Sequence, residues 1–207
     1  MRLGIYGGTF DPIHYGHLVL AEQCREQCQL DEVWFVPAAQ PPHKLDAAIS
    51  LPKARCEMIE FAIAGHPHFK LSRLELERTG PSFTVTTLKQ LREEDTSREL
   101  FLLIGADSLH DLPQWREPQR IQELATVVAV NRGDRPLPDR SLLEQQLGPA
   151  EAARLRFVQM PGFELSSSDI RQRSSEGRSI RYLVPRAVEA YIAHNHLYST
   201  AKILLTD

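Results

Sequence analysis

The sequence predicts an α/β fold built on a doubly wound, mostly parallel sheet, with a small helical part toward its C-terminal end. Short apolar runs alternate with stretches of helical periodicity, which is the pattern of repeated strand–helix–strand units. Residues 101–104, Phe-Leu-Leu-Ile, are apolar without interruption, which favours a strand covered on both faces. The 207 residues suit one domain of about 150–200 residues with a small appendage.

Each apolar run is expected to form a strand: residues 3–6, 33–36, 69–72, 100–104, 126–130 and 156–160. Amphipathic stretches between several of these runs predict helices at residues 16–30, 52–65, 84–94 and 114–124. Right-handed crossovers between parallel strands then place helices on both faces of the sheet. The last third of the chain predicts two short helices, 168–175 and 185–194, and no further strong strand.

Two segments rich in proline or glycine, residues 37–52 and 131–140, are expected to be long loops. Long loops in a compact domain are usually functional or disordered. We expect a single domain over residues 1–207, with a C-terminal helical subregion at 166–198 and a tail at 199–207. The tail contains the apolar triplet 203–205 and could pack on the body or on a second subunit, which leaves a homo-oligomer open.

Charge and cysteine content exclude several classes of protein. A formal net charge of −3 provides no general basic field for long nucleic acid. No apolar run approaches the roughly 20 residues that span a bilayer, and the chain starts directly with a strand rather than a leader. Three cysteines, a small and odd number, argue against a disulfide framework. We therefore expect a cytoplasmic protein with no nucleic-acid or membrane partner.

The densest signal is the segment 7–17, Gly-Gly-Thr-Phe-Asp-Pro-Ile-His-Tyr-Gly-His, between the first strand and the first helix. Ligands of open α/β sheets bind beyond the carboxyl ends of strands, where this loop must lie. Gly7 and Gly8 let backbone N–H groups approach a phosphate closely. A helix that begins near Tyr15 presents free N–H groups and its positive dipole end to the same anion. The segment predicts a phosphate site, although it matches neither the P-loop nor the Gly-x-Gly-x-x-Gly pattern.

His14 and His17 are three residues apart and therefore share one face of the first helical turn. An imidazole N–H can donate a hydrogen bond to phosphate in either protonation state. A metal pair or plain helix-start residues are the competing interpretations. Their place beside a glycine-rich turn favours phosphate binding.

The residues Gly7-Gly8-Thr9-Phe10-Asp11-Pro12, followed by His14-x-Gly16-His17, resemble the signature of the HIGH-motif nucleotidyltransferase superfamily. Within it the chain is similar, from residue 1 to about residue 198, to the bacterial nicotinate-nucleotide adenylyltransferases. The resemblance implies a Rossmann-like nucleotidyltransferase fold. It also implies transfer of the adenylyl group of ATP to nicotinate mononucleotide, which gives nicotinic acid adenine dinucleotide and pyrophosphate in NAD biosynthesis.

The segments 37–44, 80–87, 104–108 and 166–171 resemble further motifs of the family, as does Trp115. The resemblance implies that four residues stabilise phosphate charge during catalysis: His14, His17, Lys44 and Arg171. It implies that eight residues bind ATP: Gly7, Gly8, Thr9, Phe10, Gly105, Asp107, Ser168 and Ile170. It implies that three residues bind the mononucleotide: Thr84, Trp115 and Arg132. Phe83 departs from the tyrosine common in the family, which removes a hydroxyl at that point.

Each supporting motif also has a purely structural interpretation. Ser82 or Thr84 could cap the helix that follows, and Asp107 could cap the helix after the fourth strand. The serines at 166–168 could cap the next helix, Lys44 could be a solvated loop residue, and Trp115 could belong to the core.

None of the motifs supplies a covalent nucleophile, so the reaction is expected to be a direct in-line attack of the mononucleotide phosphate on ATP. Mg²⁺ is expected to arrive with ATP, because it prefers phosphate and water oxygens and no dedicated metal cage is visible. Rival substrates are nicotinamide mononucleotide and phosphopantetheine. From other classes, a non-catalytic nucleotide sensor or RNA-binding relative, and a metal protein using Cys24 or Cys28 beside His14, remain alternatives.

Overall fold

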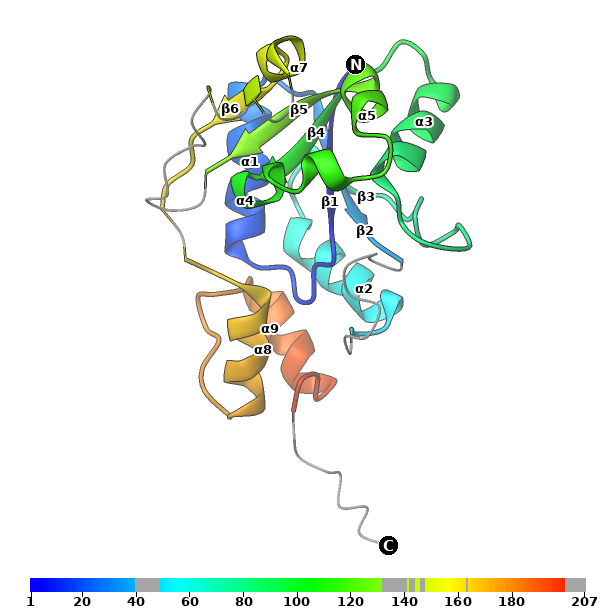
Figure 1. Cartoon of the computed structure of the whole chain (residues 1–207). Coiled ribbons are helices and arrows are strands. Elements are labelled where there is room, and N and C mark those ends of the chain that lie inside the picture. Colours follow the sequence, from blue (N-terminus) through cyan, green and yellow to red (C-terminus); the bar gives the residue numbers. More distant parts are fainter. Residues whose placement is uncertain (40–48, 132–140, 142–143, 146–147, 163, 200–207) are drawn as a thin grey trace, which may run out of the picture.

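Six parallel strands form one open sheet in the order β3-β2-β1-β4-β5-β6 (Figure 1). The computed structural model describes residues 1–39, 49–131, 141, 144–145, 148–162 and 164–199. The strands are β1 (Arg2–Gly8), β2 (Glu32–Pro37), β3 (Phe69–Leu71), β4 (Glu99–Gly105), β5 (Ala125–Val130) and β6 (Arg156–Val158). This is the doubly wound α/β fold that the sequence predicts.

The centre of the sheet is β1, which pairs with β2 on one side and with β4 on the other. Ile5 lies opposite Trp34 of β2 and opposite Leu102 of β4. From β1 the chain builds outward through β2 and β3, then crosses back to build β4, β5 and β6. The change of direction between β1 and β4 opens a crevice at the carboxyl ends of these strands, which is where such sheets bind ligands.

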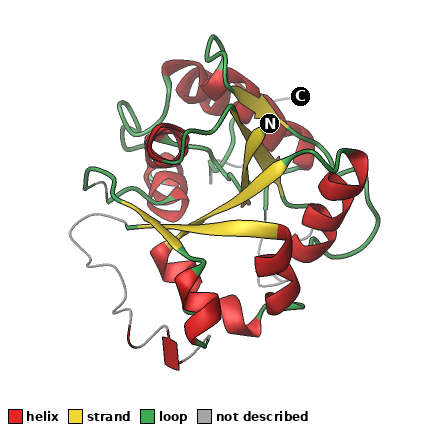
Figure 2. Ribbon diagram, turned by 90° about the horizontal axis from the view of Figure 1, so that it is seen from above, coloured by secondary structure: helices red, strands yellow, loops and turns green. Residues whose placement is uncertain are grey.

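Helices cover both faces of the sheet (Figure 2). One face packs against α1 (Tyr15–Gln27) and α2 (Pro52–Ile63), and the other packs against α3 (Thr84–Glu94) and α5 (Pro118–Leu124). Residues alternate along β4, so that Phe101 and Leu103 belong to the first core and Leu102 belongs to the second. An uninterrupted apolar strand thus serves two cores.

The predicted elements differ from the observed ones mainly at short turns. The helix expected at 114–124 is a 3-10 turn, η1 (Leu112–Gln114), followed by α5, which begins at Pro118 because proline fits the first helical turn. Two short helices, α4 (Ala106–Leu109) and α7 (Pro149–Ala153), were not expected. The strand expected at 156–160 ends at Val158.

Two C-terminal helices, α8 (Ser167–Ser175) and α9 (Arg186–His194), lie beyond the loop that follows β1 (Figure 1). Ile170 of α8 and Ile192 of α9 are buried in the core that α1 and α2 cover. Tyr191 of α9 donates a hydrogen bond of 2.5 Å to Glu57 of α2. These contacts place α8 and α9 beside the carboxyl edge of the sheet.

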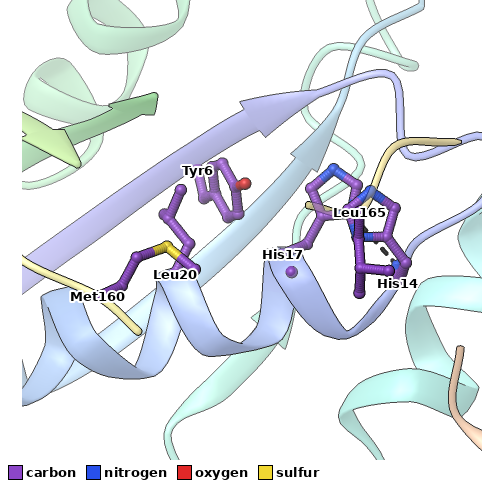
Figure 3. Close-up of a pocket in the computed structure, with 7 residues that line it drawn as sticks. Tyr6, His14, His17, Leu20, Met160 and Leu165 are labelled. Carbon is purple, nitrogen blue, oxygen red and sulfur yellow. Dashed lines mark hydrogen bonds between the residues drawn. The ribbon is translucent and has the colours of Figure 1, made fainter. Parts of the chain in front are cut away.

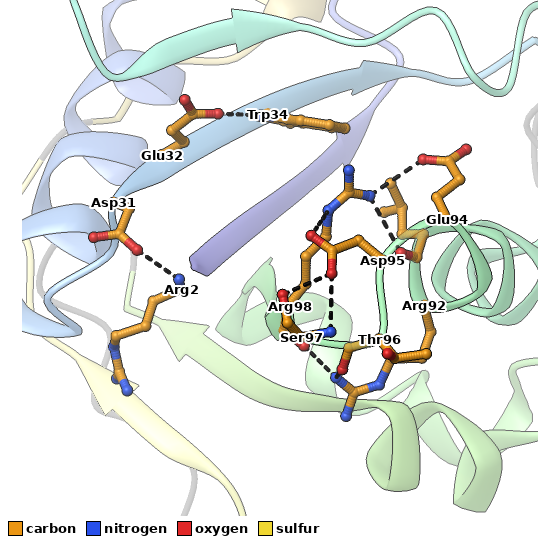
Figure 4. Close-up of polar contacts among 11 residues, drawn as sticks. Arg2, Asp31, Glu32, Trp34, Arg92, Glu94, Asp95, Thr96, Ser97 and Arg98 are labelled. Atoms are coloured by element: carbon orange, nitrogen blue, oxygen red, sulfur yellow. Dashed lines mark hydrogen bonds and ion pairs between the residues drawn. The ribbon is translucent and has the colours of Figure 1, made fainter.

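Charged side chains at the opposite, amino edge of the sheet pair with one another (Figure 4). The backbone N–H of Arg2 donates to Asp31 at 2.7 Å. The guanidinium of Arg98 lies 5.2 Å from the centre of a Trp34 ring and forms an ion pair of 3.2 Å with Glu94. In the described ranges, no helix is long and apolar enough to cross a membrane.

Replacement of Phe101 tests the central core. Its side chain is fully buried between the sheet and the α1 side of the molecule. We expect Phe101→Ala to lower the free energy of unfolding by about 3–5 kcal/mol, because the lost transfer energy and the cavity add. Urea denaturation measures this, with the exposed Tyr182→Ala as the control, for which a change below about 0.5 kcal/mol is expected. Equal losses in the two variants would contradict the packing described.

Candidate functional site

The loop that joins β1 to α1 lies at the crevice between β1 and β4. His14 is the N-cap of α1, with extended backbone angles, and the helix starts at Tyr15 as predicted. The backbone N–H of Tyr15 donates to the carbonyl of Leu183 at 3.1 Å, which anchors the helix start to the segment between α8 and α9. The loop is thus held between the sheet and the C-terminal helices.

The rings of His14 and His17 lie side by side, with their centres 3.7 Å apart and their planes tilted by 30° (Figure 3). The backbone N–H of His14 donates to Nδ1 of His17 at 3.2 Å. A ring nitrogen that accepts a hydrogen bond carries no proton, so this bond favours the neutral His17 tautomer with its proton on Nε2. The pocket that both rings face is also lined by Tyr6, Gly16, Leu20, Met160 and Leu165. In this tautomer, the proton of the His17 ring is on Nε2.

Phe10 supports His17 from the core. Its side chain is buried, has its ring centre 5.1 Å from that of His17, and meets Tyr6 edge to face at 5.4 Å. Because the side chain packs inward, the predicted contact of Phe10 with ATP could be made only by its backbone. Phe10 has a φ of +50°, a conformation that residues other than glycine adopt rarely, so the loop is strained where it leaves the strand.

The three glycines of the segment 7–17, Gly7, Gly8 and Gly16, are not equivalent. A Cβ atom on Gly8 would lie 2.9 Å from the Phe10 ring, and one on Gly16 would lie 3.1 Å from the His14 ring. A side chain at position 8 would therefore force the Phe10 ring to move, and one at position 16 would press on the His14 ring. A Cβ atom on Gly7 would meet nothing within 4 Å. The space beside Gly7 is open, which suits close approach of a ligand to the backbone.

The second predicted phosphate motif meets the first one directly. Arg171 donates to the carbonyl of Asp11 at 2.7 Å and to the hydroxyl of Ser168 at 3.3 Å. Ser167 donates to the carbonyl of Pro12 at 2.9 Å. Two segments that are about 155 residues apart in sequence thus form one surface at the start of α1.

The structural expectation for the α8 motif, a serine cap, is confirmed by its hydrogen bonds. Ser166 is the N-cap, and its hydroxyl accepts from the backbone N–H of Asp169 at 3.1 Å, as expected of a serine in this position. Ile170 is fully buried, and its backbone N–H donates to the carbonyl of Ser166. Ile170 thus supports the site from the core, and its contact with ATP stays a prediction.

A buried pair of opposite charges, Asp11 and Arg55, lies beneath the loop, and sequence reasoning did not single it out. Arg55 is 1% exposed and donates to the carbonyls of Thr9 at 2.9 Å and Ser50 at 3.1 Å. Burial lowers the pKa of the Arg55 guanidinium, and the Asp11 charge offsets part of this effect. The only signal in the sequence was an arginine on the apolar face of a predicted helix.

The segment after β2 is tied to the first motif and to the start of α3. Ala38 donates to the carbonyl of Gly8 at 2.9 Å, and Ala39 donates to the hydroxyl of Ser82 at 2.9 Å. The expected capping role of Ser82 and Thr84 is therefore wrong. The N-cap of α3 is Phe83, with no side-chain cap bond, and the Ser82 hydroxyl instead accepts from the segment after β2. Lys44 follows this segment and lies outside the described residues.

The remaining predicted ligand residues are distributed over several elements. Gly105 ends β4 opposite Val130 and is the N-cap of α4, so Asp107 inside that helix is not the cap. Trp115 is half-buried against the second core at the end of η1, so part of its side chain belongs to the core. Thr84 starts α3. Arg132 lies outside the described residues, and the adjacent Asn131 accepts from the backbone N–H of Met160 at 2.9 Å.

Cys24 lies within α1 and Cys28 at its end, whereas Cys56 follows Arg55 in α2. Cys24 is ten residues beyond His14 along α1, which corresponds to about 15 Å of helix. All three cysteines are buried, and burial raises the pKa of the Cys24 thiol, which disfavours the thiolate that metals bind. In the part of the chain that the structure describes, no group of three or more His, Cys, Asp or Glu side chains is placed to hold a metal ion.

The chain matches the model of the cytidylyltransferase-like family over residues 5–173. A Thermomicrobium roseum protein named probable nicotinate-nucleotide adenylyltransferase is 46% identical over 99% of this chain and 94% of its own length. A Thermus thermophilus protein of the same name is 48% identical over 96% of this chain and 100% of its own length. The fold matches that of a Plasmodium falciparum nicotinic acid mononucleotide adenylyltransferase complexed with NaAD. That match has a TM-score of 0.79 and 21% identity, over 95% of this chain and 97% of the other.

Replacement of Arg55 tests the support beneath the loop. Lysine keeps the charge but cannot reach two carbonyls with a planar fork, so we expect Arg55→Lys to cost about 1–3 kcal/mol for each carbonyl left without a donor. Guanidinium denaturation measures the loss. Arg186→Lys is the control, since the Arg186 side chain is 72% exposed and should change stability by less than about 0.5 kcal/mol. A loss no larger than that of the control would show that the two bonds contribute little.

Proposed function

The chain belongs to the cytidylyltransferase-like family and, within it, to the nicotinate-nucleotide adenylyltransferases, and we propose that the loop after β1 is where it transfers the adenylyl group of ATP. The acceptor is nicotinate mononucleotide, and the products are nicotinic acid adenine dinucleotide and pyrophosphate. The carrying observation is the pair His14 and His17 at the start of α1, beside the open space at Gly7.

The site is suited to a chain of phosphates. The first turn of α1 offers its positive dipole end, and His17 is arranged to donate through Nε2. The first turn of α8 and the guanidinium of Arg171 meet the same loop. We assign His14, His17, Lys44 and Arg171 to the charge that grows as pyrophosphate departs. Preorganised donors of this kind stabilise a phosphoryl transition state without moving during the reaction.

The chemistry needs no covalent intermediate. The three cysteines are buried, and a phosphate monoester is already anionic at pH 7, so no general base is required to activate it. The oxygen of the mononucleotide phosphate attacks the α-phosphorus of ATP, and the bond to pyrophosphate breaks. The substrate is proposed to be MgATP, with the ion on phosphate and water oxygens, because Mg²⁺ gives up its hydration reluctantly.

The side of the crevice formed by α3 and η1 is the place we assign to the mononucleotide. Thr84 is at the first turn of α3, which can receive an anion, and Trp115 offers a flat, half-buried ring beside the same core. Arg132 is assigned to the mononucleotide by family resemblance. For ATP we assign the backbone of Gly7 to Phe10, with Gly105, Asp107, Ser168 and Ile170.

The product assay tests the function. Purified protein is incubated with MgATP and, in separate reactions, nicotinate mononucleotide, nicotinamide mononucleotide or phosphopantetheine, and the products are separated by chromatography. We expect nicotinic acid adenine dinucleotide and one pyrophosphate per turnover, with the nicotinate substrate preferred. A stable adenylyl-enzyme, or release of phosphate in place of pyrophosphate, would contradict direct transfer. Turnover of a rival substrate alone would replace the assignment.

Replacement of His17 tests the phosphate role. Loss of one preorganised donor typically costs about 2.7–4 kcal/mol, so we expect His17→Ala to lower kcat by roughly 10²–10³ while its Tm stays within about 4 °C of the parent. His17→Asn should recover part of the rate, because its amide can accept from the His14 N–H and still donate to phosphate. Near-normal turnover of the alanine variant would mean that His17 is structural.

A further inference from the structure

Asp11 joins three segments that are far apart in the sequence. Its Oδ1 accepts a hydrogen bond of 2.5 Å from the hydroxyl of Tyr198, and its Oδ2 accepts one of 3.1 Å from the backbone N–H of Ser50. Its carbonyl accepts from Arg171. The Asp11 residue is 2% exposed, so water has little access to replace these partners. The position of the loop therefore depends on groups outside it.

The surroundings of Tyr198 favour this hydrogen bond to Asp11. It follows α9, its side chain is half-buried, and its φ of +64° is a backbone conformation that an aromatic residue rarely adopts. Burial, together with the hydrogen bond to Asp11, raises the pKa of the Tyr198 hydroxyl. The hydroxyl consequently remains a donor throughout the range in which the protein would be assayed.

The bond acts on the histidines through the backbone. Asp11 lies three residues before His14, the N-cap of α1, and six before His17. Between them, the carbonyl of Pro12 is held by Ser167, and the helix start is held by Leu183. Asp11 is therefore one of three attachments, beside Pro12 and Tyr15, that hold the turn from which both rings project.

We propose that Tyr198 is a positioning residue for adenylyl transfer, whose hydroxyl holds Asp11 and thereby sets the loop that carries His14 and His17. The proposal rests on the proposed function of that loop. It assigns a role in the reaction to a side chain 187 residues away from Asp11 in the sequence, which the motifs of the site do not include.

The chain contains a matched control. Tyr191 also donates a hydrogen bond of 2.5 Å to a carboxylate, that of Glu57. This bond joins α9 to α2 and does not reach the loop. Tyr191→Phe and Tyr198→Phe therefore remove the same chemical group and the same type of bond, one away from the loop and one on it.

The experiment compares kcat, both KM values and Tm for the parent and these two variants. We expect Tyr198→Phe to lower kcat about tenfold at nearly unchanged KM for MgATP and the mononucleotide, and Tyr191→Phe to stay within about twofold of the parent in kcat. Both should melt within a few degrees of the parent. Equal effects on kcat would overturn the positioning role, and an inert parent would instead contradict the proposed function.

Two further measurements separate positioning from general damage. In the double variant with Asp11→Asn, adding Tyr198→Phe should lower kcat no further, because the two residues act through one bond; full additivity would overturn the proposal. Ring NMR signals of His14 and His17, identified with single histidine variants, should shift in Tyr198→Phe and not in Tyr191→Phe. Unshifted signals in Tyr198→Phe would also overturn it, and this readout does not depend on turnover.

Discussion

Two opposite charges, Asp11 and Arg55, are buried beneath the loop at the carboxyl end of β1, and the geometry of the site depends on how their hydrogen-bonding groups are satisfied. Burial of a charge is costly unless every group finds a partner. Arg55 donates to two backbone carbonyls, and the Asp11 oxygens accept from Ser50 and Tyr198. Ser50 lies just before α2 and Tyr198 follows α9, so segments that are far apart in the sequence meet at this loop.

The order of the strands explains why the site lies at this edge. The chain reverses its direction of growth between β1 and β4, and the helices that follow the two strands diverge to opposite faces of the sheet. At this edge α1 starts after β1 and α4 starts at Gly105, the last residue of β4. At the amino edge, by contrast, charged groups such as Arg98 and Glu94 neutralise one another.

A reaction between two phosphates asks for charge compensation and alignment more than for reactive side chains. In the proposed site, helix starts, backbone N–H groups, the histidines and Arg171 would supply donors for this purpose. The C-terminal helices contribute directly, because Arg171 and Ser167 bond to the loop's own carbonyls. The second phosphate motif is thus also part of the structure that supports the first.

The sequence by itself determined the α/β class, the approximate positions of most strands and helices, and the turn that brings His14 and His17 together at the start of α1. These features follow from local periodicity and from residues a few positions apart, which interact within one element. The tertiary structure decided that Ser82 bonds to the segment after β2 instead of capping α3, that the side chain of Phe10 packs inward beside His17, and that Asp11 meets Tyr198. Such contacts depend on how distant segments pack, and no spacing in the chain specifies which buried donor will meet which acceptor.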